Sequence, residues 1–287
     1  MKTHPCFNAQ ASRKWGRVHL PVAAGCNIAC GYCDRRTDCV NESRPGVTSR
    51  VMSPEEAVAY LGRALEVMPN ISVAGIAGPG DPLASPESTL ETIRLVRNRY
   101  PSLSLCLSTN GLGLPGYITD LRALGVGYLT LTINALEPVV GERVYRSVRF
   151  GGRVWNGAEG AAILIYRQRQ ALEALRGYGF TVKINTVVIP GCNDQQVGPI
   201  ARLAAAHGAV LMNCLPLIPV PGTPLGHLNP PDALLMARVR DQAGHYLKQM
   251  RHCGRCRADA VGLICPTGDD TAVSALSPAS MAATPAA

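Results

Sequence analysis

Three cysteines in the spacing Cys-x3-Cys-x2-Cys are the residues of this sequence best suited to carry chemistry: Cys26, Cys30 and Cys33. Cysteine thiolates hold the irons of a 4Fe-4S cluster, and three thiolates leave the fourth iron without a protein ligand. Such an open iron can bind a small molecule, whereas a fully ligated cluster only passes electrons. A structural zinc site favours paired Cys-x2-Cys units, and ferredoxin clusters are held by a different run of cysteines. The spacing therefore predicts a 4Fe-4S cluster with one open iron.

The same segment has an aromatic residue, Tyr32, directly before the third cysteine, and it resembles the cluster motif of the radical S-adenosylmethionine (SAM) superfamily. The resemblance implies that Cys26, Cys30 and Cys33 hold the catalytic 4Fe-4S cluster. It also implies that the amino and carboxylate groups of SAM bind the open iron, and that Tyr32 lies beside the adenine.

Strand-like and helix-like segments alternate along the chain and would position this loop. Strands are predicted at 18–23, 71–76, 103–107, 128–133, 182–189 and 209–215. Helices are predicted from the candidate N-cap Ser53 onward, and at 86–98, 117–124, 157–178 and 195–207. Such alternation favours a parallel sheet with right-handed crossovers. Six strands suit an α/β fold, a partial (β/α)6 radical SAM barrel with chemistry at the carboxyl ends of its strands.

The predicted organisation is a radical SAM core flanked by N- and C-terminal cysteine-bearing extensions. Low-complexity composition at the end of the chain is typical of a disordered tail. The expected boundaries are 1–16 for the N-terminal extension, 17–250 for the core, 251–266 for the C-terminal cluster-binding segment and 267–287 for the tail.

Glycine-rich and polar segments follow the predicted strands. The segment Gly75–Pro82 resembles the glycine-rich motif whose carbonyl groups meet the SAM ammonium, and bare backbone lets a ligand approach closely. Polar residues after the third and fourth strands suit contacts to ribose and carboxylate, and residues 185–194 are expected to close over the adenine. Besides Tyr32, the predicted SAM contacts are Gly78, Gly80, Asp81, Thr109, Asn110, Asn134 and Val188.

The chain contains eleven cysteines, so eight lie outside the motif. Cys253 and Cys256 form a Cys-x2-Cys pair, which is half of a metal site, and Cys106 lies near the end of a predicted strand. A surplus of thiols suggests additional iron–sulfur clusters, either as electron relays or as substrates. His19 is either a hydrogen-bonded core residue or a metal ligand. Small buried hydrophobes are the expected role of three others, Cys192, Cys214 and Cys265.

Four runs resemble the NifB family of nitrogenase cofactor biosynthesis proteins: residues 4–7, 19–22, 39–46 and 253–263. The resemblance implies a lyase-class enzyme that fuses two 4Fe-4S clusters into an eight-iron cluster with a central carbide. One SAM donates a methyl group, and a second is cleaved reductively so that its radical removes hydrogen from that methyl group. The implied ligands of the two substrate clusters are Cys6, His19, Cys39, Cys106, Cys253 and Cys256, and the implied catalytic, proton-handling residues are Glu42 and Arg44.

The resemblance also implies partners. These are cluster donor proteins, a ferredoxin or flavodoxin reductant, and a separate cofactor carrier. The carrier is expected to be separate because we expect a stand-alone form without the carrier domain of many family members. The net charge of +8 and the pI near 9.0 would suit an acidic protein. Nucleic-acid binding is not expected, since the Lys and Arg residues are scattered. No apolar signal or membrane span is evident, and the cysteine surplus fits metal chemistry in a reducing cytoplasm.

Two other functions are compatible with parts of the sequence. The first is a radical SAM enzyme that modifies an organic or peptide substrate and uses its additional clusters as electron relays. The second is a non-catalytic iron–sulfur scaffold that stores and delivers clusters. A scaffold would have no need for the SAM-like glycine loop, and SAM cleavage would exclude it.

Overall fold

The computed structural model describes residues 4–41 and 47–265. The tail expected at 267–287 lies outside the described residues, and so do Glu42 and Arg44.

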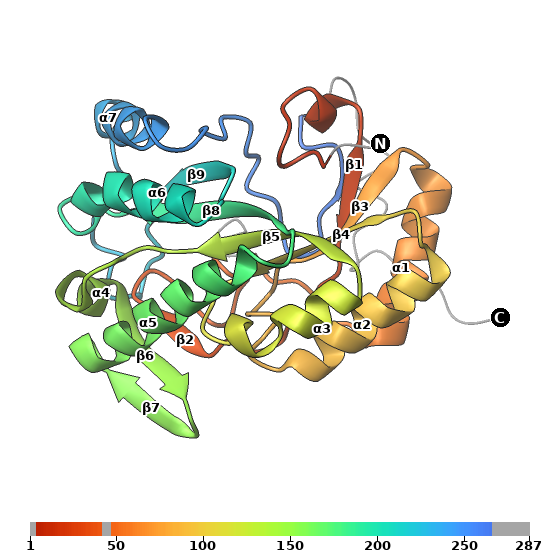
Figure 1. Ribbon diagram of the computed structural model, residues 1–287, viewed down its shortest axis with the longest axis horizontal. Coiled ribbons are helices and arrows are strands. Elements are labelled where there is room, and N and C mark those ends of the chain that lie inside the picture. Colours follow the sequence, from red (N-terminus) through yellow and green to blue (C-terminus); the bar gives the residue numbers. More distant parts are fainter. Residues whose placement is uncertain (1–3, 42–46, 266–287) are drawn as a thin grey trace.

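A curled seven-stranded sheet forms the centre of the molecule, in the order β10-β1-β3-β4-β5-β8-β9 (Figure 1). The six strands from β1 to β9 run parallel, whereas β10 pairs antiparallel with β1. The predicted six-stranded partial barrel is therefore confirmed. The strands are β1 (Gly16–His19), β3 (Ile71–Ile76), β4 (Ser104–Thr109), β5 (Val126–Thr132), β8 (Thr181–Val188), β9 (Leu211–Pro216) and β10 (Val261–Gly262).

Helices connect the parallel strands and pack along the outside of the sheet (Figure 1). In the first helix, the Ser53 hydroxyl accepts a hydrogen bond from the Glu56 N–H while the Glu56 carboxylate accepts one from the Ser53 N–H, a capping box. The α-helices are α1 (Pro54–Val67), α2 (Pro86–Arg99), α3 (Ile118–Ala123), α4 (Pro138–Val144), α5 (Gly157–Leu175), α6 (Val197–Ala206) and α7 (Ala233–Gly244). The strand–helix alternation of the sequence predicted neither α4 nor α7. Three short 3-10 turns are η1 (Ala11–Arg13), η2 (Leu114–Gly116) and η3 (Asp194–Gln196).

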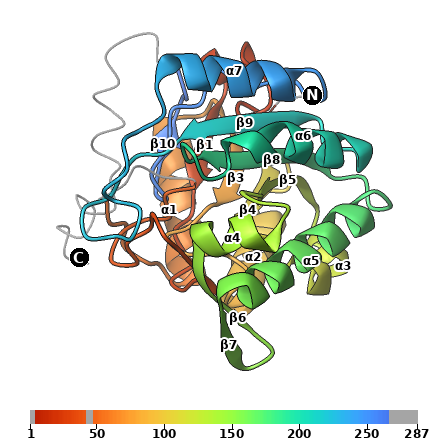
Figure 2. The same ribbon diagram turned by 90° about the vertical axis from the view of Figure 1, so that its left-hand side faces the viewer.

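A second, antiparallel sheet of three short strands was also not predicted. It contains β2 (Ile28–Cys30), β6 (Tyr145–Phe150) and β7 (Arg153–Asn156), in that order. The β6–β7 hairpin turns at Gly151 and Gly152, which both have positive φ (60° and 75°), as a two-residue hairpin turn with matching twist requires. It projects from the body of the molecule (Figure 2). Exposed arginines interrupt the apolar alternation that would have predicted these strands.

Two clusters of buried apolar side chains hold the layers together. The larger lies between the sheet and the helices and includes Leu129 and Ile184 of the strands and Leu61 and Ile200 of the helices. The smaller includes Tyr32 and packs residues 26–41, here called the thiol loop, against buried side chains such as Val148 and Val187. Each fully buried side chain of this size contributes about 1.5–3 kcal/mol. In the described ranges, no helix is long and apolar enough to cross a membrane.

The C-terminal extension pairs with β1 on the side of that strand that faces away from β3. The β10 strand pairs with β1 at Val261 and Gly262, and the His19 N–H donates a hydrogen bond to the Ala260 carbonyl (2.8 Å). Residues that are over 200 positions apart in the sequence are thereby fixed side by side.

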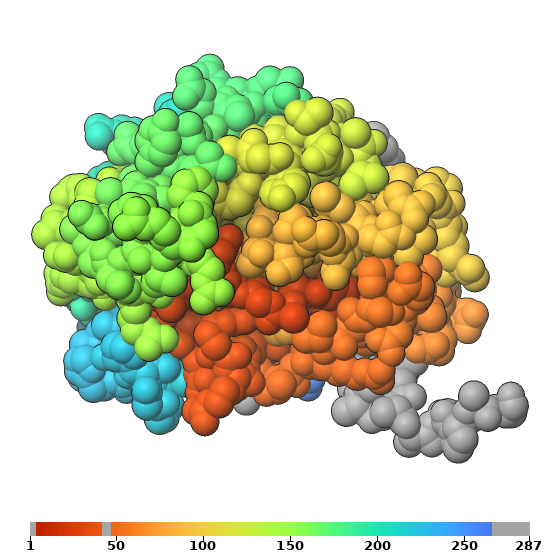
Figure 3. Space-filling view, turned by 90° about the horizontal axis from the view of Figure 1, so that it is seen from below, coloured from red at the N-terminus to blue at the C-terminus, as the bar shows by residue number. Residues whose placement is uncertain are grey.

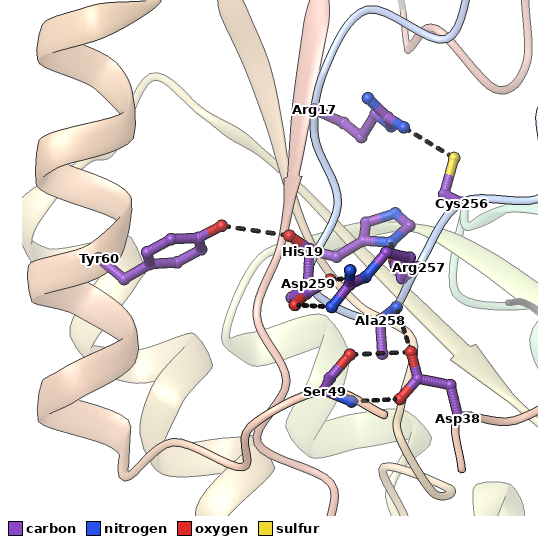
Figure 4. Close-up of polar contacts among 9 residues, drawn as sticks. All are labelled: Arg17, His19, Asp38, Ser49, Tyr60, Cys256, Arg257, Ala258 and Asp259. Atoms are coloured by element: carbon purple, nitrogen blue, oxygen red, sulfur yellow. Dashed lines mark hydrogen bonds and ion pairs between the residues drawn. The ribbon is translucent and has the colours of Figure 1, made fainter. Parts of the chain in front are cut away.

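A buried carboxylate joins this extension to the thiol loop (Figure 4). The side chain of Asp38 accepts hydrogen bonds from the Ala258 N–H (3.0 Å) and from the N–H and hydroxyl of Ser49 (3.0 and 2.8 Å). Close by, the Tyr60 hydroxyl of α1 donates to the Asp259 carbonyl (3.1 Å). The thiol loop, α1 and the C-terminal extension therefore depend on one another for their positions.

We expect Asp38→Ala to lower the free energy of unfolding by about 3 kcal/mol, because it leaves buried N–H and O–H donors of Ser49 and Ala258 without an acceptor. Thermal unfolding would measure the loss, and hydrogen exchange at the Ala258 amide should accelerate. The matched control is Asp34→Ala in the same loop. That carboxylate pairs with the exposed Arg36, so its loss should change the free energy of unfolding far less than the loss of Asp38. Equal effects of the two substitutions would contradict this role of Asp38.

Candidate functional site

The thiol loop lines a cavity of about 410 Å³, here called the loop cavity. Cys26, Cys30 and Cys33 all face it, so the structure brings the three predicted thiols together. Cys39 lines the same cavity, although the sequence analysis grouped it with the substrate-cluster ligands. Its position is fixed because the Cys39 N–H donates a hydrogen bond to the Pro79 carbonyl in the loop after β3 (2.9 Å).

Burial makes the thiolate forms of Cys26 and Cys30 costly in the metal-free chain. Burial and the charge of Asp81 raise the pKa of Cys26 to about 12. The pKa of Cys30 is also raised, by burial and by the neighbouring Cys33 and Cys26. Cations stabilise grouped thiolates, and Arg35 is the one cationic side chain among the described residues that line this cavity. The donor set therefore fits a bound metal cluster that supplies the remaining positive charge.

The three thiols are not arranged around one ion. Within 4–41 and 47–265, no three His, Cys, Asp or Glu side chains are grouped closely enough to hold a single metal. The thiolates of a 4Fe-4S cluster each bind a different iron, so a cluster does not require three thiols around a single ion.

The glycine-rich loop after β3 packs directly against the start of the thiol loop. The Gly80 N–H donates to the Ala23 carbonyl (2.6 Å) and the Asp81 N–H to the Gly25 carbonyl (2.7 Å). A Cβ on Gly80 would lie 1.8 Å from the Gly25 carbonyl oxygen, so no other residue fits there without displacing the backbone. Gly78 has a φ of 142°, which also favours glycine. These glycines thus let two loops meet at the cavity.

The carboxylate of Asp81 organises the ends of β3 and β4. It accepts hydrogen bonds from the Thr109 hydroxyl (2.9 Å) and from the backbone N–H groups of Asn110 (2.6 Å) and Leu83 (2.9 Å). The Asn110 side-chain amide in turn lies 3.8 Å from the Cys26 sulfur. Gly80, Asp81, Thr109 and Asn110 all line the loop cavity, so these four predicted SAM contacts lie beside the thiols.

The other predicted SAM contacts lie behind the cavity wall. The Tyr32 hydroxyl donates to the Asn41 side-chain oxygen and accepts from the Asn134 amide, both at 2.7 Å. The Asn134 oxygen accepts from the Val187 N–H (2.8 Å), and the Val188 carbonyl accepts from the Leu217 N–H (3.1 Å). Tyr32, Asn134 and Val188 are fully buried. In this arrangement they support the cavity wall, and direct contact with SAM stays a prediction.

A second cavity of about 650 Å³, here called the barrel cavity, adjoins the first. Asn41 and Ser108 line both cavities, so they form the wall between them. Five of the six predicted substrate-cluster ligands line the barrel cavity: Cys6, His19, Cys106, Cys253 and Cys256. They come from the N-terminal segment, from β1, from β4 and from the C-terminal extension.

The barrel cavity carries positive charge. Arg17, on β1, and Lys183, on β8, line it together with two histidines, and none of its described lining residues is Asp or Glu. The Arg17 guanidinium donates to the Cys256 sulfur (2.8 Å; Figure 4) and to the carbonyl of Gly262. Neither cation was predicted from the sequence. Strand alternation could have identified both, because side chains two residues apart on a strand face the same side. Arg17 lies two residues before His19, and Lys183 two residues before Asn185, and all four line the barrel cavity.

The two histidines that line this cavity are held in opposite tautomers. His19 Nδ1 lies 3.0 Å from the Arg257 carbonyl oxygen, so Nδ1 carries the proton and Nε2 keeps its lone pair, the arrangement found in metal-ligating histidines. Burial and the charge of Arg17 lower the pKa of His19 to about 4, which keeps the ring neutral. In His4, Nδ1 accepts the Cys6 N–H (3.1 Å), so Nε2–H is the donor, and it has no hydrogen-bond partner among the described residues.

The three cysteines expected to be structural line neither cavity. Cys214 is buried on β9, and its thiol donates to the Gln249 side-chain oxygen (3.3 Å). Cys192 follows β8 and is half-buried, and so is Cys265 near the end of the described chain. Cys214 and Cys192 have their pKa raised by burial, which leaves both as neutral thiols.

Solved structures share this fold. Methylornithine synthase (PylB) superposes with a TM-score of 0.50 over 84% of this chain and 72% of its own, at 16% sequence identity. The radical SAM methyltransferase TsrM from Kitasatospora setae gives a TM-score of 0.50 over 74% of this chain and 38% of its own, at 15% identity. At such low identity the likeness concerns the fold alone.

Sequence comparison is more specific. The model of the radical SAM superfamily matches residues 20–204. FeMo cofactor biosynthesis proteins NifB match at 47% identity in Chlorobaculum tepidum (98% of this chain, 66% of the relative), 44% in Klebsiella pneumoniae (91% and 57%) and 41% in Azotobacter vinelandii (92% and 53%). The chain thus spans about half to two thirds of the length of the curated relatives it matches. The chain belongs to the radical SAM superfamily and, within it, to the NifB family.

Proposed function

We propose that this chain fuses two 4Fe-4S substrate clusters in the barrel cavity and inserts a SAM-derived carbide, forming the eight-iron precursor of the nitrogenase cofactor. One observation carries the proposal: five sulfur and nitrogen donors from four separate parts of the chain converge on a cavity that shares a wall with the loop cavity. A carbon group taken from SAM in one cavity would then have only the Asn41–Ser108 wall to pass before it reached a substrate in the other.

Cys26, Cys30 and Cys33 would hold the resident 4Fe-4S cluster, with SAM beside the Asp81–Asn110 segment. When bound, the cluster and SAM supply a methyl group and, on reduction, a carbon-centred radical that abstracts hydrogen. The protein's own part is to hold the thiols rigidly. Asn110 contacts the Cys26 sulfur and donates a second hydrogen bond to the Asn27 side-chain oxygen (2.7 Å), which fixes the start of the thiol loop.

In the barrel cavity, the ligand set suits substrates that must leave again. A neutral imidazole binds iron less tightly than a thiolate does, so His19 gives one substrate cluster a replaceable ligand. Iron–sulfur clusters with thiolate ligands are anionic, and Arg17 and Lys183 would balance this charge at short range, where screening is weak. His4 lines the same cavity, and its Nε2–H, which has no hydrogen-bond partner among the described residues, would be available to donate to a bound substrate cluster.

Apolar side chains complete the barrel cavity and would keep water away from a reactive carbon. They are contributed by the inner face of the sheet and by the C-terminal extension, and include Val73, Ile76, Leu215, Met250 and Ile264. The partners that suit this activity are cluster donor proteins, a ferredoxin or flavodoxin reductant and a separate carrier for the product, in the cytoplasm.

For the reconstituted, anaerobic chain we expect about twelve irons, which corresponds to three 4Fe-4S clusters. After addition of dithionite and SAM, both S-adenosylhomocysteine and 5′-deoxyadenosine should form, because methyl transfer and hydrogen abstraction consume separate SAM molecules. Iron analysis and chromatography of the SAM products measure these quantities. About four to eight irons with 5′-deoxyadenosine alone would instead indicate a radical enzyme with an organic or peptide substrate. Absence of SAM cleavage would leave only the scaffold function.

Single cysteine substitutions should separate the two cavities. Cys106→Ser or Cys256→Ser is expected to remove about four irons and to abolish the eight-iron product, while reductive SAM cleavage continues. Cys30→Ser should abolish SAM cleavage. Cys214→Ser is the matched control, because that thiol lines neither cavity and its loss should change neither quantity. The proposal fails if Cys256→Ser behaves as Cys214→Ser does in iron content and in product formation.

A further inference from the structure

The β6–β7 hairpin concentrates positive charge at the surface. Residues 145–156 contain three arginines and no aspartate or glutamate. All three arginines are exposed, whereas the nearest acidic residues in the sequence, Glu142 on α4 and Glu159 on α5, lie outside the hairpin. We call this surface the arginine hairpin; its arginines are Arg146, Arg149 and Arg153.

Exposed apolar groups lie among these charges. Phe150 is 38% exposed and Val154 55% exposed, beside the two-glycine turn. The Arg153 guanidinium lies 4.7 Å from the Trp155 ring centroid, and that of Arg167 lies 5.2 Å from the Phe150 ring. Arginines and aromatic rings are the residues enriched where proteins bind one another, and a small apolar centre with a charged rim is typical of brief encounters.

The arginine hairpin is attached to the thiol loop by backbone hydrogen bonds. Strand β6 pairs with β2, which is the stretch of the loop that ends at Cys30. The Arg149 N–H donates to the carbonyl of Asn27 (2.7 Å), the residue that follows Cys26, and the Gly31 N–H donates to the Val144 carbonyl (2.7 Å). The lime-green hairpin and the red thiol loop lie side by side on one face (Figure 3). A bound protein at this surface would therefore be separated from two cluster thiols by a single strand.

We propose that the arginine hairpin is the docking surface for an acidic one-electron donor protein that reduces the cluster held by Cys26, Cys30 and Cys33. The proposal rests on the proposed function, which requires one electron for each reductive cleavage of SAM. One electron passes from the reduced donor to the cluster, the donor is oxidised by one electron, and no bond forms or breaks in that transfer.

Two observations favour an electron donor over a protein that delivers or removes cluster cargo. No residue of 145–156 lines the barrel cavity, where cargo would have to enter or leave. The hairpin instead contacts the thiol loop, which an electron must reach. Positive charge at the site raises the rate at which an acidic partner arrives and makes that rate sensitive to salt.

The test is anaerobic stopped-flow reduction of the reconstituted chain by an acidic, pre-reduced ferredoxin at low ionic strength, compared with reduction by dithionite. The test variant is Arg146→Glu/Arg149→Glu/Arg153→Glu. We expect its second-order rate with ferredoxin to fall by about tenfold or more and to lose its dependence on salt. The rate with dithionite should stay within about twofold, because this small anion needs no docked protein surface.

The control variant makes the same change in net charge elsewhere: Arg63→Glu/Arg176→Glu/Arg202→Glu, three exposed residues on or at the end of α1, α5 and α6. Its rate with ferredoxin should stay within about threefold of the wild type, since long-range charge is largely screened. Equal rates for the hairpin and control variants would overturn the docking proposal. So would a hairpin variant that lost only binding to duplex DNA or RNA while it kept its rate with ferredoxin. Failure of dithionite to reduce any cluster in the wild type would overturn the proposed function itself.

Discussion

The carboxyl ends of all strands in a parallel sheet lie on the same side, and the two cavities of this protein depend on that constraint. The donors at the end of β1 and on β4 are far apart in the sequence, yet the register of the sheet brings them to one cavity. The remaining thiols come from segments outside the sheet, which must be pinned against this edge. The pairing of β10 with β1 and the buried Asp38 carboxylate do this for the C-terminal extension. These contacts, together with the hydrogen bond between Arg17 and Cys256, fix the C-terminal extension relative to β1.

The thiol loop is held from two sides, and this explains why its thiols lie in one cavity. On one side the glycine-rich loop packs so closely that a Cβ at Gly80 could not be accommodated. On the other side β2 pairs with β6, so the middle of the loop is a strand in a small sheet. The same pairing places the arginine hairpin next to the thiol loop. One element thus supports this loop and would also provide the docking surface for the proposed electron donor.

Electrostatics distinguishes the two cavities. The loop cavity has one arginine and one carboxylate among its described lining residues, so its buried thiols would need the charge of bound iron. The barrel cavity has Arg17 and Lys183 and no described carboxylate, which suits anionic substrates. Its histidines are held in opposite tautomers by backbone groups, so His19 offers a lone pair where His4 offers an N–H. His19 was considered as a ligand from the sequence, whereas His4 was not. The place of His4 at the cavity and the hydrogen bond from the Cys6 N–H that sets its tautomer follow only from the fold.

The family and the six parallel strands could be predicted from the sequence, and the Cys-x3-Cys-x2-Cys motif singles out three cysteines as candidate cluster ligands. Local patterns are sufficient for these, because motif spacing and strand–helix alternation do not depend on distant residues. Which donors share a cavity depends on the folded chain. In the folded chain Cys39 lines the loop cavity, where its N–H donates a hydrogen bond to the Pro79 carbonyl, and Arg17, Lys183 and His4 line the barrel cavity. Proximity between segments as distant as residues 17 and 256 is set by sheet register and by buried polar contacts, which no local pattern of the sequence records.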